Sequence, residues 1–173
     1  MVAQVLGTGE WVLLNYRLPR EPSTPRSAVW RKLRQLGAAQ LSDGLVGLPA
    51  DARTREQLEW VAEQIREAHG TAALWVAHPA SFGQERELAK TMAMARATEY
   101  RALSAEAVSA AGLSATERLR VVRRLRNDLH RVRRRDFFPP PERDEAITAI
   151  EALADDTDIG DPLLAHEPGA AHW

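Results

Sequence analysis

Apolar and polar residues alternate over residues 10–18, a pattern typical of a β-strand that ends at Pro19. Apolar side chains then recur at helical spacing until Gly37, which predicts a first helix. Two short apolar runs, residues 38–41 and 45–48, flank an Asp-Gly dipeptide that favours a tight hairpin turn. The chain is therefore expected to begin with a strand, a helix and a β-hairpin.

A second helix and a fourth strand complete this pattern. Thr54, with Gln57 three residues later, resembles a capping box, and helical spacing then continues to Gly70. Residues 71–77 supply another apolar strand. The order β-α-β-β-α-β is that of a ferredoxin-like sandwich, with both helices on one face of an antiparallel sheet. We therefore predict an α+β fold whose ferredoxin-like βαββαβ domain occupies residues 9–80.

The rest of the chain is expected to form a helical extension and a tail. Trp11 and Trp75 should lie on the uncovered sheet face, an apolar patch that needs a cover. Residues 81–154 read as helices interrupted near Gly112, and this C-terminal helical extension is expected to supply the cover. Residues 155–173 are acidic and read as a flexible tail.

Four tryptophans fall on four different predicted elements. This distribution favours core packing over a platform for stacking bases, which would place aromatic residues on the two central strands. The four are Trp11, Trp30, Trp60 and Trp75.

The charge of the chain is nearly balanced overall and strongly uneven along its length. The 173 residues carry a net charge of −1, which by itself argues against a strongly basic nucleic-acid binder. Residues 114–135, however, carry +7, and residues 136–173 carry −9. Such a basic block beside an acidic one often marks an interaction segment.

The basic block predicts an amphipathic helix that also forms a candidate DNA-binding surface. Its apolar stripe consists of Leu119, Val122, Leu125, Leu129 and Val132. The candidate nucleic-acid-binding residues on the other side are Arg120, Arg123, Arg124, Arg131, Arg134 and Arg135. Such a face suits phosphate contacts. The alternative is a solvated face that neutralises the acidic tail.

The turn before this helix allows two interpretations. Small residues around Gly112 fit a helix-turn-helix, but Arg118 stands where that motif needs an apolar side chain. An ordinary αα-hairpin with Ser114 as the N-cap needs no special residue, and we favour it.

The start of the first helix is a second candidate site. Ser23, Thr24 and Arg26 combine hydroxyls, a guanidinium and a helix N-terminus, a combination that suits a small tetrahedral oxyanion. Simple helix capping with a solvated arginine is the alternative, and we favour it.

Several classes of site have no sequence support. Zero cysteine excludes disulfides and thiolate chemistry, and the five histidines show no metal-ligand spacing. Nucleotide-cofactor and hydrolase motifs are also missing. We expect no enzymatic activity, no cofactor and no metal site. The absence of a long apolar stretch and of a leader-like start predicts a cytoplasmic protein without a membrane partner.

Several motifs resemble the N-terminal domain of the ChrB chromate-resistance regulators. They are residues 11–19 (WVLLNYRLP), 21–23 with Arg26, 29–31, 36–38, 41–44, 48–49 and 134–138 (RRDFF). The resemblance implies a transcriptional regulator that represses chromate-efflux genes and releases DNA when chromate is present. Full-length members carry a second, C-terminal domain to which the chromate response is assigned. The chain is therefore expected to be a stand-alone N-terminal domain.

The resulting expectation is a DNA-binding homodimer, since two-fold symmetry suits the recognition of paired half-sites. A separate sensor-domain protein is a further expected partner, and chromate or sulfate is a possible ligand. The alternatives are a protein–protein interaction module and an oxyanion-binding accessory protein.

Overall fold

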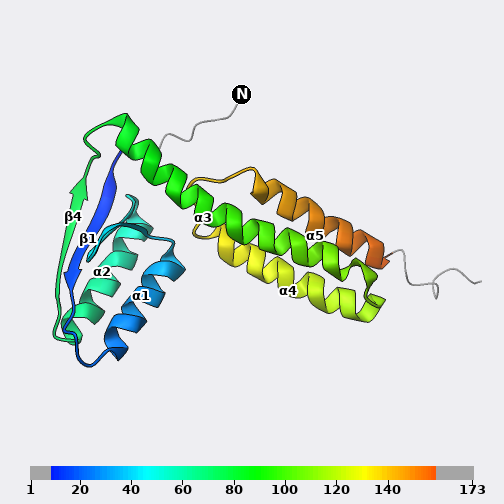
Figure 1. The fold of residues 1–173 in the computed structure, drawn as a ribbon, viewed down its shortest axis with the longest axis horizontal. Helices are drawn as coiled ribbons and strands as arrows, with labels where there is room; N and C mark the ends of the chain where they lie inside the picture. Colours follow the sequence, from blue (N-terminus) through cyan, green and yellow to red (C-terminus); the bar gives the residue numbers. More distant parts are fainter. Residues whose placement is uncertain (1–8, 159–173) are drawn as a thin grey trace, which may run out of the picture. The chain divides into compact units, whose positions relative to one another are not determined.

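The computed structural model describes residues 9–158, a mixed α/β chain with a four-stranded antiparallel sheet and five α-helices (Figure 1). It divides into two compact units. Unit 1 contains residues 9–95 and 135–139, and unit 2 contains residues 96–134 and 140–158. None of the helices among the described residues combines the length and apolar character that crossing a bilayer requires.

The sheet of unit 1 has the strand order β2-β3-β1-β4, with every neighbouring pair antiparallel. Each strand lies close to the place that the pattern of apolar residues predicted. The strands are β1 (Trp11–Arg17), β2 (Ala39–Ser42), β3 (Leu45–Pro49) and β4 (Thr71–Ala77). The central strand β1 therefore pairs with both β3 and β4.

Two helices, α1 (Thr24–Leu36) and α2 (Ala52–Glu67), cover one face of this sheet (Figure 1). Between helices and sheet lies a core of fully buried side chains, which include Leu14, Leu58 and Ile65. Burying each such aliphatic side chain contributes about 1.5–3 kcal/mol relative to leaving it exposed. The packing of this core therefore holds the helices on the sheet.

The predicted capping box of α2 was wrong in its residues. Asp51 is the N-cap, and its carboxylate accepts a hydrogen bond from the Thr54 N–H at 2.6 Å. The Thr54 hydroxyl in turn accepts from the Asp51 N–H at 2.9 Å and donates to the Pro49 carbonyl at 2.7 Å. The helix begins earlier than expected because this buried threonine closes the box instead of opening it.

The other face of the sheet is partly covered within unit 1. Trp11 is buried and stacks on Phe138, with ring centroids 6.1 Å apart. Leu88 and Met92, from the first part of α3 (Phe82–Ser109), join the same core. The exposed patch expected around Trp11 is therefore covered by segments that follow the sheet in sequence.

The prediction that the four tryptophans pack in the core was correct for Trp11 and wrong for the other three. Trp30, Trp60 and Trp75 are 50%, 67% and 60% exposed. Trp30 and Trp60 lie on the outward sides of α1 and α2, and Trp75 lies on the edge strand β4. An apolar residue on a predicted element enters the core only when it faces the neighbouring layer.

Unit 2 is helical. The second part of α3, the short 3₁₀ helix η1 (Ala110–Gly112), α4 (Ala115–Arg133) and α5 (Glu142–Asp158) form it. The helices share an apolar core that includes Tyr100, Leu125 and Ile150. Helix α5 continues past residue 154, where the tail was expected to begin, and residues 159–173 of that predicted tail lie outside the described residues.

Gly44 in the β2–β3 turn provides a test of this fold. Its φ is +73°, and a Cβ at this position would overlap the main-chain oxygen of Tyr16. We predict that Gly44→Ala lowers the free energy of unfolding by about 2 kcal/mol, because the alanine must adopt a left-handed conformation and its Cβ must clash with the main chain. Urea unfolding followed by circular dichroism measures the change.

Gly83→Ala is the matched control, since its nearest neighbouring atom, Ser81 Oγ, lies at an ordinary contact distance of 3.8 Å. Gly83 lies inside α3, where alanine is the better helix former. Equal stability of Gly44→Ala and the unsubstituted protein would contradict the described turn.

Candidate functional sites

Helix α4 begins at the residue that the sequence indicated. Ser114 is the N-cap, and its hydroxyl accepts a hydrogen bond from the Glu117 N–H at 3.4 Å. The Glu117 carboxylate accepts from the Ser114 N–H at 3.1 Å and from the Ser114 hydroxyl at 2.6 Å. These hydrogen bonds from Ser114 lower the pKa of Glu117. The box therefore fixes where the basic helix starts.

The apolar side of α4 was predicted correctly except at its first position. Val122, Leu125, Leu129 and Val132 are buried in the core of unit 2, whereas Leu119 is 56% exposed. Arg118, four residues before Val122, takes the inward position that Leu119 was expected to fill.

Arg118 uses this position to bind main-chain carbonyls. Its guanidinium donates to the carbonyls of Ala111, Leu113 and Asp156 at 3.2, 3.3 and 3.2 Å. The first two carbonyls belong to the turn before α4, and the third belongs to α5. Arg118 therefore joins three segments of unit 2, and its role is structural.

The structure divides the six predicted nucleic-acid-binding arginines into three groups. Arg120 and Arg123 are exposed, and the structure gives their side chains no hydrogen bond or ion pair with any described residue. Arg124 pairs with Glu106 of α3, and Arg131 pairs with Asp128 at 3.2 Å. Arg134 and Arg135 follow the end of α4 at Arg133.

The two paired arginines remain on the surface. The hydrogen bond from Arg124 to Glu106 raises the pKa of this guanidinium further above its ordinary value. Such exposed pairs are weak because water screens them, so a phosphate can compete with the carboxylate for the arginine.

Two further exposed arginines of α4, Arg126 and Arg133, were missed by the sequence analysis. Both residues lie at the edge of the apolar stripe. Sorting the helix into one apolar side and one opposite basic side therefore assigns them to neither. An arginine at such a border can direct its guanidinium into water while its aliphatic stem covers apolar surface. Their spacing of seven residues, which returns to the same side after two turns, was the available signal.

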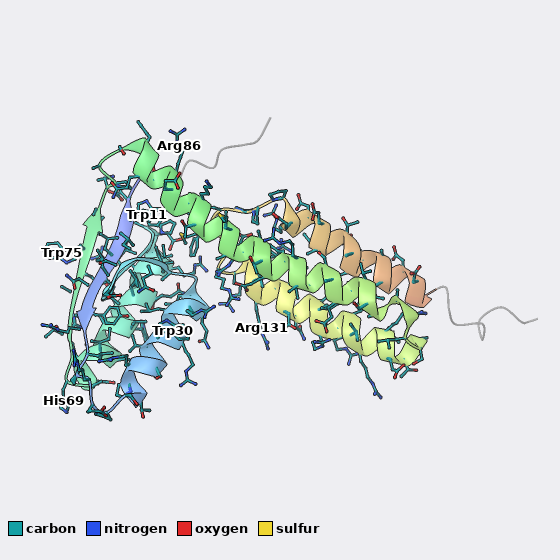
Figure 2. The ribbon with its side chains drawn as sticks, viewed as in Figure 1. Trp11, Trp30, His69, Trp75, Arg86 and Arg131 are labelled. Atoms are coloured by element: carbon teal, nitrogen blue, oxygen red, sulfur yellow. The ribbon has the colours of Figure 1, made fainter. Side chains whose placement is uncertain are left out.

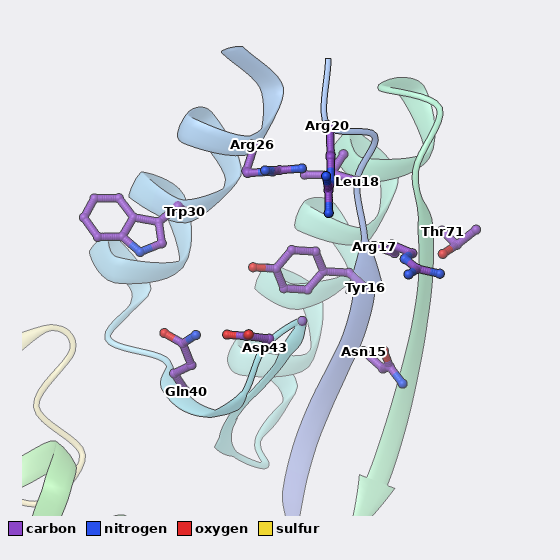
Figure 3. A pocket seen from close by; sticks show the side chains of 11 residues that line it. Asn15, Tyr16, Arg17, Leu18, Arg20, Arg26, Trp30, Gln40, Asp43 and Thr71 are labelled. Carbon is purple, nitrogen blue, oxygen red and sulfur yellow. The ribbon is translucent and has the colours of Figure 1, made fainter. Parts of the chain in front are cut away.

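Unit 1 contains a cavity of about 810 Å³ at the end of β1 (Figure 3). Residues from β1, α1 and the β2–β3 hairpin meet around it. Its lining consists of Asn15, Tyr16, Arg17, Leu18, Arg20, Arg26, Trp30, Gln40, Asp43, Gly44 and Thr71. Three arginines and one aspartate make this lining basic.

The predicted oxyanion-binding residues do not act as one group. Arg26 lines the cavity and donates to the Pro19 carbonyl at 3.1 Å, whereas Ser23 and Thr24 do not contribute to the lining. Ser23 is the N-cap of α1 by backbone position, and its side chain makes no capping hydrogen bond. Of the three predicted residues, only Arg26 therefore lines the cavity, and the sequence did not predict that cavity.

Tyr16 projects into the middle of this cavity (Figure 3). Its main-chain N–H donates to the Gly44 carbonyl at 2.7 Å, which joins β1 to the hairpin turn. Partial burial raises the pKa of the Tyr16 phenol, Arg26 opposes the rise and Asp43 adds to it. Tyr16 is therefore a neutral hydrogen-bond donor at physiological pH.

No group of three or more His, Asp or Glu side chains within residues 9–158 is placed to hold a metal ion.

Similarity to known proteins assigns this chain to a family. The family described as "Protein ChrB, N-terminal" matches residues 26–112. Protein ChrB of Cupriavidus metallidurans is 32% identical over 166 residues, a match that covers 94% of the chain. It covers 49% of the relative, so the chain spans about half the length of that protein. No solved structure matches the chain. Because the family match extends over half of the sequence, the chain belongs to the family of ChrB N-terminal domains.

Proposed function

We propose that this chain serves chromate resistance as a DNA-binding transcriptional regulator of ChrB type. Family membership supports the chromate-resistance role, and α4 supports DNA binding. The observation that carries the proposal is the group of exposed α4 arginines for which the structure gives no acceptor among the described residues: Arg120, Arg123, Arg126 and Arg133.

The packing of α4 makes this arginine face suitable for a phosphate backbone. Its apolar side is anchored in the core of unit 2, and Arg118 and the capping box fix its beginning. The face therefore approaches a duplex as a preformed surface. Guanidinium groups bind phosphate through charge-assisted, bidentate hydrogen bonds, which position a protein on DNA without reading its sequence.

We infer four further properties of this regulator. The first unit is a ferredoxin-like sandwich, supported by the order β2-β3-β1-β4 and the two helices on one face. The protein acts in the cytoplasm, performs no chemical conversion and works with a separate sensor-domain protein.

The salt dependence of DNA binding tests the role of α4. We predict that Arg120→Gln with Arg123→Gln weakens binding to every duplex and reduces the slope of log K against log salt by about 1.8. The slope changes because each lost phosphate contact removes about 0.9. Fluorescence anisotropy titrations at several salt concentrations measure both effects.

A double variant with the same loss of charge is the control. Arg31 and Arg86 are exposed arginines of α1 and α3, and Figure 2 labels Arg86. Arg31→Gln with Arg86→Gln should leave the slope unchanged. If both double variants reduce the slope equally, net charge and not α4 governs binding. If neither changes it, α4 is a solvated surface or a protein-binding surface.

We further propose that β4 pairs with β4 of a second copy to form the homodimer. Among the described residues, β4 pairs with β1 alone, which makes it an edge strand. It is seven residues long and uncharged, whereas the opposite edge, β2, has four residues and an irregular register. Long, uncharged edges are the strands most suited to pairing with another chain.

The side chains of β4 support this interface. Trp75 and Val76 are 60% and 55% exposed although they face opposite sides of the sheet. A strand added at the edge covers both sides at once. Arg66 donates to the Ala72 carbonyl at 3.3 Å, so this main-chain acceptor near the start of β4 is already used. We therefore assign the pairing with the second copy to the later part of β4. Antiparallel pairing about a two-fold axis brings no like charges together there.

The oligomeric state tests this interface. We predict that Trp75→Glu converts the dimer to a monomer in sedimentation equilibrium, because two carboxylates would be buried beside an apolar edge. Trp60→Glu, a substitution of the same chemistry at an exposed position of α2, should leave the dimer intact. A monomeric unsubstituted protein, or equal effects of the two substitutions, would refute the β4 interface.

A further inference from the structure

We propose that the cavity of unit 1 binds an organic anion with a planar ring, of the chemical class of the nucleoside monophosphates. The cavity is lined entirely by residues of unit 1. Ligand binding at this cavity is therefore independent of DNA binding by α4.

The size of the cavity argues for an organic ligand. Its volume of about 810 Å³ lies within the range of pockets that bind small organic molecules and cofactors, about 300–1,000 Å³. A tetrahedral oxyanion such as sulfate would fill a small part of this space and would leave the aromatic lining unused.

The arginines supply the site for the anionic group. Arg20 and Arg26 both line the cavity near the Tyr16 ring (Figure 3). Arg26 is held by its hydrogen bond to the Pro19 carbonyl, which leaves other N–H groups of its guanidinium to donate to a ligand. Two arginines and a phenol hydroxyl that line one cavity offer several donors to a phosphate.

Trp30 supplies the surface for the ring. Its indole is half exposed and lines the cavity. The Arg34 guanidinium carbon lies 4.8 Å from the centroid of this ring, an arrangement that holds the indole in place by a cation–π contact. A planar ring can stack on the remaining indole surface, which contributes about 1–3 kcal/mol for a nucleobase on an aromatic side chain.

The remaining polar residues favour a ligand with two different ends. Gln40 and Asp43 lie on the other side of the Tyr16 ring from Arg20 and Arg26 (Figure 3). The Asp43 carboxylate repels an anion but accepts hydrogen bonds from an amino group or a sugar hydroxyl. The Gln40 amide can both donate and accept. A nucleoside monophosphate has this polarity, with its charge at one end and neutral hydrogen-bonding groups at the other.

Calorimetric titration with matched ligands tests the proposal. The purified full chain is titrated with the four ribonucleoside monophosphates, with the corresponding nucleosides and with inorganic phosphate. At least one monophosphate should bind about tenfold or more tightly than its nucleoside and than phosphate, because phosphate and ring each contribute contacts. Phosphate that binds as tightly as every monophosphate would overturn the proposal, as would the absence of heat from all ligands.

Variants of the lining residues locate the site. Arg20→Gln and Arg26→Gln should each weaken monophosphate binding about tenfold and leave weak nucleoside binding unchanged, whereas Trp30→Ala should weaken both ligands. Arg31→Gln, on the same helix but outside the lining, is the control and should bind normally. Circular dichroism confirms that each variant folds. Normal binding by Trp30→Ala and by both arginine variants would overturn the assignment to this cavity.

Discussion

The double pairing of β1 is the constraint on which unit 1 depends. Strand β3 pairs with β1 only as far as Asn15, whereas β4 pairs with it as far as Arg17. The side chains of β1 are mostly buried from Trp11 to Leu14 and more exposed beyond Leu14. Leu14 lies in the core between sheet and helices, whereas Tyr16, two residues later on the same side, reaches the cavity. The hydrogen bond from Tyr16 to Gly44 connects that end of the strand to the hairpin turn. The rigidity of the core therefore extends to the wall of the proposed site.

The elements of both units could be predicted from sequence because each rests on a local period. A two-residue period marked β1, and short apolar runs marked the other strands. Gly37 and Gly112 marked helix ends that the structure contains. The errors concern what each element faces. Trp30 is as apolar as Trp11, yet only Trp11 meets a second layer, which is supplied by Phe138 far along the chain. Local periodicity contains no information about that contact.

The two candidate sites differed in how much of them the sequence could reveal. The arginine face belongs to a single helix, so a spacing of about 3.6 residues per turn was enough to group Arg120 with Arg123. The cavity joins β1, α1 and the hairpin, and its residues are neighbours only after folding. Ser23 and Thr24 were grouped with Arg26 because they adjoin it in sequence, although the cavity takes Arg26 alone of the three.

Arg118 and Arg123 show that position decides what an arginine does on α4. Arg118 faces inward, where its guanidinium must replace lost water with carbonyl oxygens, and it binds three of them. Arg123 faces outward and keeps its water, which a phosphate oxygen can displace while counterions are released. Counting arginines therefore overstates the binding capacity of this helix. The capacity resides in those guanidinium groups whose donors the fold has not already used.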